Sequence, residues 1–505
     1  MTAKTLMVQG TSSSAGKSIL VTALCRIMKM DGYKVAPFKA QNMALNSFVT
    51  LEGGEIGRSQ AVQAIAAGIE PSVCMNPVLL KPQADSVSHL VVMGKSIDVT
   101  DAAAYYRQNH KLLPVIREAL ERLRGEYDIV IIEGAGSPAE INLMDREIAN
   151  MRIAGLARSP VLLIADIDRG GVFASITGTM QLLPWRQRRL IKGFVINKFR
   201  GDVSLLKPGL EFLERRYSRP VLGVIPYIRN IRIAQEDSVY LDERGNPDRP
   251  SRPDICIIRL PHIACYDDFD PLEYSCSVRY VSSLHELGRP DLIILPGTKG
   301  TISDMNFLHR SGLAAEIIKR ALEGLPVIGI CGGYQMLGLS IRDPLHAESS
   351  EEEVAALGLL DIETTYEMEK VTTQVEAAVL SPSGLLAGMA DTEAGGYEIH
   401  MGRTKLKSGR PAFRVTKSIR NELYEEGAVN QAGNVFGTYL HGLFNKAGFT
   451  RQLLANLCRL HGLPPVEHCP PPGQEAYDEL ASQIRQHLDI DKVYEIMAGG
   501  INGRA

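Results

Sequence analysis

Short, continuously apolar runs recur along the first half of the chain, and they restrict its fold more than any other feature. Strands buried on both faces of a parallel sheet consist of such continuous apolar runs, whereas strands with one solvent-exposed face alternate apolar and polar residues. Helix-forming stretches separate the runs, so the pattern predicts an α/β fold with a doubly wound, mostly parallel sheet. The runs occupy residues 5–10, 34–39, 127–134, 161–168, 193–199 and 220–226.

At 505 residues, the chain is longer than one hydrophobic core usually supports. Residues 241–253, LDERGNPDRPSRP, combine charge, glycine and three prolines, which is typical of an exposed linker. The apolar runs resume at residues 254–260, 291–297 and 326–333, and residues 371–415 then alternate, which indicates an antiparallel extension. We therefore predict four parts: an α/β domain over 1–240, the linker over 241–253, a second α/β domain over 254–450, and a helical tail over 451–505 packed on the body.

The first apolar run leads into a glycine-rich segment, GTSSSAGKS at residues 10–18, and then into a helix-forming stretch. In this order, the loop N–H groups and the helix N-terminus converge on one point and favour a phosphate group there. Lys17 would reach the terminal phosphates of a nucleotide, and the Ser18 hydroxyl would bind Mg²⁺. Thr11 stands where the strict motif has glycine, so a structural glycine turn is the alternative. The predicted ATP contacts in this loop are Gly10, Thr11, Gly16, Lys17 and Ser18.

Two further strand ends carry polar residues that suit a nucleotide site. Glu133 closes a very apolar run, where a metal-binding carboxylate belongs in an open parallel sheet. A solvated strand-end carboxylate is the alternative. Asn197 and Lys198 follow another run and resemble positions that recognise the base in nucleotide-binding domains, although an ordinary loop explains them nearly as well. We predict that Ser18 and Glu133 bind Mg²⁺ and that Asn197 and Lys198 contact the nucleotide.

A second motif, GICGGYQMLG at residues 329–338, places Cys331 between an apolar run and two glycines. A sharp strand-to-helix turn of this kind exposes a nucleophile and points it at the helix N-terminus, which favours the thiolate. The backbone N–H of Gly332, and that of Gly297 in a second strand-end turn, would stabilise an oxyanion. The other seven cysteines are interpreted as small buried hydrophobes.

A cysteine that attacks an amide requires a base, and eleven histidines compete for this role. His441 follows the strand-like NVFGTYL and precedes Gly442, so it ends a strand, where a side chain can overhang a catalytic cleft. His400 in GYEIHMG is the main alternative. The predicted catalytic pair of an amidase is therefore Cys331 and His441.

The extended glycine-rich loop and the later EGAG, residues 133–136, together resemble the dethiobiotin synthetase-like branch of P-loop proteins. Members of this branch use ATP to phosphorylate a substrate carboxylate. The resemblance implies that a lysine after the second strand lies beside that carboxylate, and Lys39 fits this position. An aspartate that helps to hold Mg²⁺ in this branch has no clear counterpart between residues 40 and 60, where Glu55 is a weak substitute.

GICGGYQMLG, PGTKGT, GYEIHMG and TYLHGLF together resemble a class I, triad-type glutamine amidotransferase domain of the subtype found in corrinoid synthases. Most triad enzymes carry a glutamate two residues after the histidine, whereas this chain has Leu443 there. The subtype is known to lack that glutamate. The resemblance thus implies that Cys331 and His441 act together and leaves the orienting partner of His441 open.

With both domains in this order, the chain resembles the cobyrinic/cobyric acid synthase family from residue 5 to about residue 490. The resemblance implies that glutamine supplies ammonia and that Mg-ATP activates corrinoid carboxylates, with adenosylcobyrinic acid a,c-diamide amidated at positions b, d, e and g. The sibling reaction that makes the a,c-diamide is the closest alternative. A P-loop switch ATPase with a vestigial amidase domain is an alternative of another class. Segments that carry the likeness are FKAQNMALNS, EIGRSQAVQA, NPVLLKP, DIDRGGVFAS and NKFRGD, and the corrinoid contacts suggested by charge are Arg58, Lys81, Arg169 and Arg200.

Composition limits the partners and the compartment. A net charge of −3 argues against a dedicated polyanion binder, so we predict no nucleic-acid partner. Eight scattered cysteines without CxxC pairs suit reduced thiols. The start of the sequence lacks the features of a signal peptide, and no apolar run approaches the roughly 20 residues that cross a bilayer. We expect a cytoplasmic protein without membrane contact, and the oligomeric state stays open.

Overall fold

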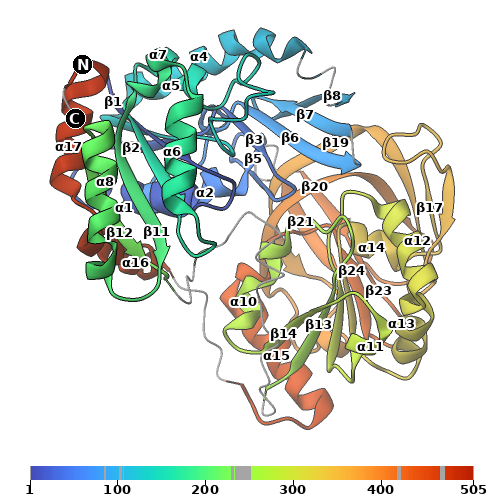
Figure 1. Ribbon diagram of the computed structural model, residues 1–505. Helices are drawn as coiled ribbons and strands as arrows, with labels where there is room; N and C mark the ends of the chain where they lie inside the picture. Colours follow the sequence, from blue (N-terminus) through green and yellow to red (C-terminus); the bar gives the residue numbers. More distant parts are fainter. Residues whose placement is uncertain are drawn as a thin grey trace. The chain divides into compact units, whose positions relative to one another are not determined.

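The structure is a computed structural model of the single chain (Figure 1). The predicted linker, 241–253, lies outside the described residues except for its last two, Arg252 and Pro253. No helix in the described part of the chain is long and apolar enough to span a membrane. The structure describes residues 2–84, 87–101, 105, 107–228, 233, 252–417, 422–466 and 473–503.

The chain divides into two compact units, and the division does not follow the sequence order strictly. A short N-terminal stretch, Leu45–Gly54, folds with the second unit, and the C-terminal helices fold with the first. The predicted domains, residues 1–240 and 254–450, assign residues 45–54 to the first unit and do not join the C-terminal helices to it. The first unit comprises Met1–Ala44, Glu55–Asp237 and Pro472–Ala505, and the second comprises Leu45–Gly54 and Ser238–Pro471.

The first unit is built on a parallel sheet with the strand order β12-β11-β10-β1-β9-β2. Side chains of β1 point alternately to the two faces: Leu6 and Val8 join one hydrophobic cluster, whereas Met7 joins the other. Burial on both faces explains why these strands read as continuous apolar runs. The order reverses beside β1, and ligands bind at such switch points, outside the C-terminal ends of the strands. The strands are β1 (Lys4–Gly10), β2 (Val35–Phe38), β9 (Ile129–Glu133), β10 (Val161–Asp166), β11 (Ile191–Phe199) and β12 (Val221–Pro226).

Helices cover both faces of this sheet (Figure 1). The C-terminal helices α16 and α17 pack on the same face as α1, where Leu480 and Ile484 join Leu20 and Leu24 in one cluster. A smaller sheet has the order β3-β6-β7-β8. Its strands are β3 (Gln41–Met43), β6 (Val78–Ala84), β7 (Val87–Val92) and β8 (Lys95–Asp101); β5 (Glu55–Gly57) also belongs to this unit. The helices are α1 (Lys17–Met30), α2 (Arg58–Ala67), α4 (Leu113–Glu126), α5 (Met151–Ala157), α6 (Val172–Leu182), α7 (Trp185–Arg188), α8 (Lys207–Tyr217), α16 (Gln474–His487) and α17 (Ile490–Gly499).

The second unit also has a central sheet, with the order β14-β13-β15-β16-β24-β23, in which β23 is antiparallel to β24. The other neighbours are parallel, so the C-terminal ends of β13, β15, β16 and β24 meet at one edge. The strands are β13 (Asp254–Ile258), β14 (Ser277–Val281), β15 (Leu292–Leu295), β16 (Val327–Ile330), β23 (Ala428–Val429) and β24 (Val435–Thr438). The helices are α10 (Asp270–Glu273), α11 (Leu284–Leu287), α12 (Thr301–Ser311), α13 (Leu313–Leu322), α14 (Gly332–Met336) and α15 (Ala447–His461).

An antiparallel extension follows, as the alternation over residues 371–415 predicts. It forms a sheet with the order β18-β17-β19-β21-β22, and β20 also pairs with β19. The fold class expected from the sequence, a first α/β domain with a doubly wound, mostly parallel sheet and a second α/β domain, is therefore confirmed. The strands are β17 (Ser340–Arg342), β18 (Glu353–Ala355), β19 (Ile362–Val379), β20 (Glu393–Leu406), β21 (Phe413–Lys417) and β22 (Leu423–Glu426); β4 (Ser47–Val49) also belongs to this unit.

Candidate nucleotide and amidase sites

The glycine-rich loop lies between β1 and α1, at the C-terminal edge of the parallel sheet. Gly16 has a φ of 101°, and a Cβ at this position would lie 2.0 Å from Nδ2 of Asn197. Glycine is therefore required here by both backbone conformation and space. The Asn197 amide donates to the carbonyl of Ala15 over 2.9 Å. Asn197 thus supports the loop itself, whereas the sequence suggested a contact with the nucleotide base.

Lys17 directs its ammonium group over this loop. Its Nζ donates to the carbonyls of Ser12, over 2.9 Å, and Gly136, over 3.1 Å. A Cβ on Gly10 would lie only 3.0 Å from that Nζ, so the first glycine leaves room for the charge. Thr11 donates its backbone N–H to Ile164 of β10, which extends the sheet pairing by one residue. The loop and Lys17 together present a cationic, N–H-rich surface of the kind that binds phosphate.

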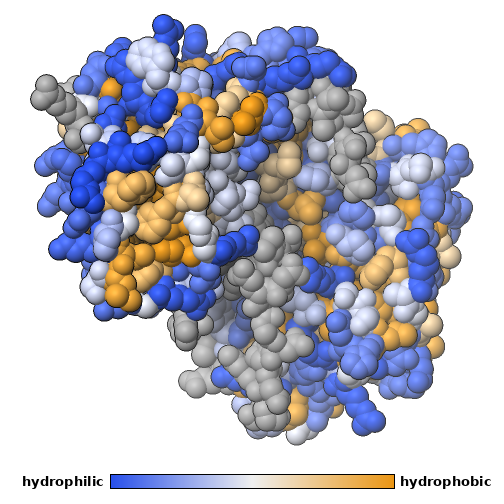
Figure 2. Space-filling view, in the orientation of Figure 1, coloured by the Kyte–Doolittle hydropathy of each residue, from blue (hydrophilic) through white to orange (hydrophobic). Residues whose placement is uncertain are grey.

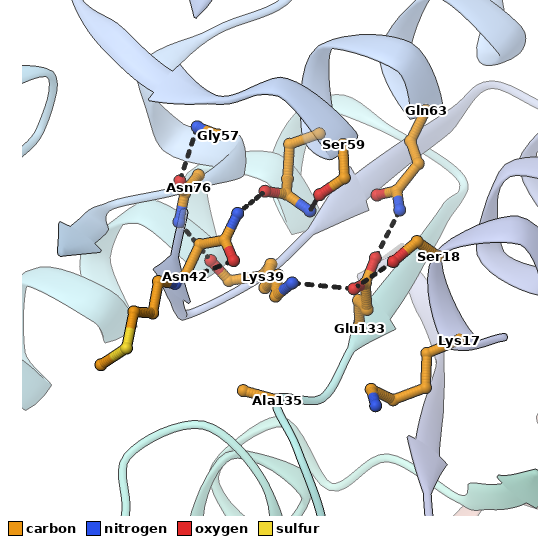
Figure 3. Close-up of polar contacts among 12 residues, drawn as sticks. Lys17, Ser18, Lys39, Asn42, Gly57, Ser59, Gln63, Asn76, Glu133 and Ala135 are labelled. Atoms are coloured by element: carbon orange, nitrogen blue, oxygen red, sulfur yellow. Dashed lines mark hydrogen bonds and ion pairs between the residues drawn. The ribbon is translucent and has the colours of Figure 1, made fainter. Parts of the chain in front are cut away.

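Glu133 is the centre of a buried polar cluster at the end of β9 (Figure 3). Its Oε1 accepts from Ser18 Oγ over 2.9 Å and from Lys39 Nζ over 2.8 Å, and its Oε2 accepts from Gln63 over 2.5 Å. Burial by itself would raise the pKa of Glu133, but the charge of Lys39 and these hydrogen bonds outweigh it and hold the pKa below its ordinary value. The carboxylate is therefore ionised and buried, not the solvated strand end that was the alternative.

The position of Glu133 suits a bound Mg²⁺. The Ser18 hydroxyl already touches the carboxylate, so one cation can contact both oxygens. Glu55, considered from the sequence as a further ligand, instead forms a buried ion pair with Lys81. No cluster of three or more His, Cys, Asp or Glu side chains able to hold a metal occurs in the described part of the chain. Mg²⁺ commonly keeps several waters and binds through one or two carboxylates plus substrate phosphates, and Ser18 and Glu133 fit that pattern.

The charged residues suggested as corrinoid contacts lie in different surroundings. Lys81 is buried with Glu55, so its charge is compensated inside the unit. Arg200 pairs with Asp168 over 2.7 Å. Arg169, the residue after Asp168, is exposed. Lys198, expected at the nucleotide, forms an ion pair with Asp166 over 2.9 Å. Of these groups, Arg169 and Arg200 keep their charge at the surface.

Cys331 occupies the sharp turn between β16 and α14. Its φ is 52° and its ψ is −108°, a conformation that costs a non-glycine residue energy and is typical of a nucleophile elbow. Its side chain is buried, and its backbone N–H donates to Thr438 of β24 over 2.8 Å. The following helix, α14, has only five residues, so its dipole is weaker than the sequence suggested.

The two predicted oxyanion glycines lie against the same site. A Cβ on Gly297 would lie 3.0 Å from Cε1 of His441 and 3.7 Å from Cβ of Cys331. A Cβ on Gly332 would lie 3.2 Å from the backbone nitrogen of Thr298. The turns after β15 and β16 therefore approach each other closely, and the structure brings Cys331, His441 and both glycines together.

Asp268 supplies the orienting partner that the sequence left open. His441 Nδ1 lies 2.7 Å from Asp268 Oδ2, and the backbone N–H of Gly442 donates to Oδ1 over 2.8 Å. Both side chains are buried. Asp268 follows β13, whose C-terminal end lies at the same sheet edge as those of β16 and β24. The acidic segment DDFD after the apolar run 254–260 was the available signal for this residue.

The surroundings of His441 favour its protonated form. Burial lowers the pKa of His441, but the side chains of Cys265 and Asp268 outweigh this effect and raise the pKa well above its ordinary value. His400, the alternative base, donates from Nδ1 to the carbonyl of Gly402 and stacks on Tyr439 with ring centroids 3.7 Å apart. Burial lowers the pKa of His400 to about 3. His441, not His400, therefore combines a carboxylate partner with proximity to Cys331.

These two sites define the class of protein. A P-loop nucleotide-binding unit is joined, in one chain, to an α/β unit with a Cys–His–Asp arrangement of the glutamine amidotransferase type. Residues 6–239 match the model of the CobQ/CobB/MinD/ParA nucleotide binding domain, and residues 254–449 match that of the CobB/CobQ-like glutamine amidotransferase domain.

Similar proteins narrow this class to one family. A cobyric acid synthase of Dehalococcoides mccartyi is 58% identical over 99% of this chain and 100% of its own length. Those of Desulforamulus reducens and Streptococcus sanguinis are each 49% identical, over 99% and 98% of this chain and 99% of their own lengths. The chain belongs to the cobyric acid synthase family.

Proposed function

We propose that the protein is a glutamine-dependent, ATP-driven ligase that amidates corrinoid carboxylates in cobalamin biosynthesis. Its substrate would be adenosylcobyrinic acid a,c-diamide, amidated at positions b, d, e and g to give adenosylcobyric acid. The observation that carries the proposal is the presence, in one chain, of a Cys331–His441–Asp268 site and a phosphate loop beside the buried Lys39–Glu133 pair. The cobyric acid synthases that match nearly the whole chain support it.

In the amidase unit, Cys331 would attack the side-chain carboxamide carbon of glutamine. The N–H groups of Gly297 and Gly332 would stabilise the oxyanion, and His441 would protonate the departing ammonia. Water, deprotonated by His441, would then release glutamate from the thioester. Asp268 would hold His441 with its proton on Nδ1, which leaves Nε2 available for these transfers.

In the synthetase unit, the loop from Gly10 to Ser18 would bind the ATP phosphates, with Lys17 at the terminal ones. A corrinoid carboxylate would attack the γ-phosphorus of ATP and form an acyl phosphate, with ADP as the leaving group. Ammonia would then attack the carbonyl carbon, phosphate would leave, and an amide would remain. Activation is required because a carboxylate is a poor electrophile. Lys39 would neutralise charge beside the reacting carboxylate.

Mg²⁺ would be held by Ser18 and Glu133 together with nucleotide phosphates, and its chemistry there is to neutralise phosphate charge. Gln63, which the sequence did not single out, would keep the Glu133 carboxylate in place from its second oxygen. Lys39 also keeps this carboxylate in place, by donating to its Oε1. The carboxylate thus stays ionised and fixed, as a ligand of a hard cation must be.

The corrinoid would bind at the carboxyl ends of β10 and β11. Arg169 and Arg200, which follow these strands, supply charge for an anionic substrate. Val203 and Leu205, which lie between β11 and α8, are exposed apolar side chains that suit the face of a large ring. Hydrophobic side chains also gather on the face of the first unit shown in Figure 2. We further propose a cytoplasmic location, since the seven cysteines of the described chain are free thiols.

Mass spectrometry of the corrinoid product tests this function. Purified protein is incubated with the a,c-diamide, ATP, Mg²⁺ and glutamine, and glutamate release is measured in parallel. We expect four amidations and glutamate formation. No amidation of the a,c-diamide, together with two amidations of cobyrinic acid in a parallel incubation, would indicate the sibling reaction. ATP hydrolysis without glutamate release would indicate the switch ATPase.

Replacement of Asp268 tests the orientation of His441. In Asp268→Asn, the amide N–H would face Nδ1 and force the proton onto Nε2, so we expect glutamine hydrolysis to fall by about 10²- to 10⁴-fold. Loss of the negative charge also lowers the pKa of His441, so the alkaline limb of the remaining activity should move to lower pH. The rate of glutamate release against pH measures both effects.

Asp254→Asn is the matched control, because Asp254 is the first residue of β13, the strand that precedes Asp268 in the chain, and pairs with Arg279. This variant should hydrolyse glutamine normally. Wild-type hydrolysis by Asp268→Asn would show that Asp268 does not orient the histidine.

A further inference from the structure

The stretch Leu45–Gly54 folds against the amidase unit although the sequence on both sides of it belongs to the synthetase unit. Within it, Ser47, Val49 and Thr50 are fully buried. A turn closes its far end: Thr50 accepts a hydrogen bond at Oγ1 from the N–H of Gly54 and donates its own N–H to the Gly54 carbonyl. The stretch is therefore a folded part of the amidase unit and not a loose connection.

Within the amidase unit, the stretch contacts β19 and β20. Tyr397 Oη donates to the carbonyl of Ser47 over 3.3 Å, and Gln374 donates to that of Val49 over 2.5 Å. Val49 forms a small apolar cluster with Tyr397 and Ile399. Two alternate residues of β20 are thus covered by this stretch.

The same two residues of β20 contact the proposed catalytic residues. Tyr397 and His441 exchange two backbone hydrogen bonds, of 3.1 and 2.9 Å, and their rings stack with centroids 5.2 Å apart. The Ile399 carbonyl lies 3.6 Å from Cys331 Sγ, within reach of a thiol hydrogen bond. A shift of Tyr397 or Ile399 would therefore move His441 or Cys331.

The residues that flank the stretch form hydrogen bonds within the synthetase unit, and the bonds of Gly57 and Asn76 are drawn in Figure 3. Ala44 donates its N–H to Leu80 over 3.1 Å at one end. At the other, the N–H of Gly57 donates to Asn76 Oδ1 over 2.9 Å, and Asn76 Nδ2 donates to the carbonyl of Lys39 over 3.0 Å. Lys39 is the residue that pairs with Glu133.

One side chain of the stretch is unsatisfied in this arrangement. Asn46 is fully buried, and neither atom of its amide has a hydrogen-bond partner in the described part of the chain. A buried amide left in this way is costly, and a shift of the stretch or a bound ligand would relieve it. The unsatisfied amide of Asn46 therefore favours a different position of the stretch or the binding of a ligand.

We propose that residues 45–54 position the amidase catalytic groups, and that occupancy of the nucleotide site acts on glutamine hydrolysis through this segment. The proposal rests on the proposed function. Ligand-induced movement of Lys39 or Asn76 would reach the stretch through Gly57, and then Tyr397 and Ile399 through Ser47 and Val49. Small displacements of catalytic groups change rates strongly, so a modest shift suffices.

The test replaces Val49 by alanine and measures glutamate release with and without ATP plus corrinoid. Removing two methyl groups loosens the cover on Tyr397 and Ile399, so we expect kcat for glutamine hydrolysis to fall about tenfold with KM nearly unchanged. The effect of ATP plus corrinoid on that rate should shrink as well. Synthesis from added ammonia should stay at the wild-type rate, because it bypasses the amidase. Tyr397→Phe keeps the ring on His441 but removes the Ser47 bond, and should show a smaller change of the same kind.

Val354→Ala is the matched control, since Val354 is a buried valine of the same unit whose strand, β18, pairs with β17. It should leave hydrolysis and its response to ligands unchanged. Wild-type hydrolysis by Val49→Ala, or an equal loss of glutamine- and ammonia-dependent synthesis, would overturn the positioning role. If the unmodified protein releases no glutamate, the proposed function itself fails; if it does and Val49→Ala is unchanged, only this inference fails.

Discussion

Cys331→Ser should abolish synthesis from glutamine and leave synthesis from ammonia intact. A serine hydroxyl is a far weaker nucleophile than a thiol beside a protonated histidine, so glutamate release should fall by about 10⁴-fold or more. The acyl phosphate is formed in the other unit and reacts with any ammonia that reaches it. Corrinoid amidation with glutamine or with ammonium salt as nitrogen source, at equal pH, measures the two activities separately.

A second buried thiol provides the control for this experiment. Cys458 lies on α15, and Cys458→Ser should retain both activities. If Cys331→Ser still hydrolysed glutamine, the nucleophile would have to be Cys265, whose side chain interacts with His441. Loss of hydrolysis in Cys265→Ser but not in Cys331→Ser would then reverse the assignment.

The sequence was most informative where backbone geometry dictates residue type. The apolar runs before GTSSSAGKS and GICGGYQMLG became β1 and β16, because strands covered on both faces tolerate few polar residues. Gly16 could be anticipated for a similar reason, since its positive φ and its contact with Asn197 admit no side chain. Glu133 was identified as a strand-end carboxylate, although its full burial was not foreseen.

The sequence was least informative where distant segments meet. Asp268 follows β13, whereas His441 follows β24, and only the strand order brings the two together. Gln63 reads as one polar residue in an alanine-rich helix, and its contact with Glu133 depends on how α2 packs. The local sequence also does not predict that residues 45–54 fold with the amidase unit, because burial of β4 depends on contacts with the distant strands β19 and β20.

Lys17→Ala should strongly reduce synthesis from both glutamine and ammonia, which separates it from Cys331→Ser. Lys17 is the loop residue whose cationic group would meet the terminal phosphates, and loss of one such charge typically costs about 10²- to 10³-fold in phosphoryl transfer. In the described structure its Nζ lies against the Ser12 and Gly136 carbonyls, so alanine also leaves those acceptors without this donor. ATP consumption and amide formation, each measured with both nitrogen sources, report the effect.

Lys29→Ala is the control for this loss, because Lys29 is an exposed lysine in the last turn of the same helix, α1. It should retain synthesis from either nitrogen source. Glutamate release by Lys17→Ala in the absence of ATP shows that the amidase unit is folded, since its proposed chemistry does not use Lys17. Undiminished amide formation from ammonia in Lys17→Ala would mean that the glycine-rich loop is a structural turn, and that ATP is activated elsewhere in the chain.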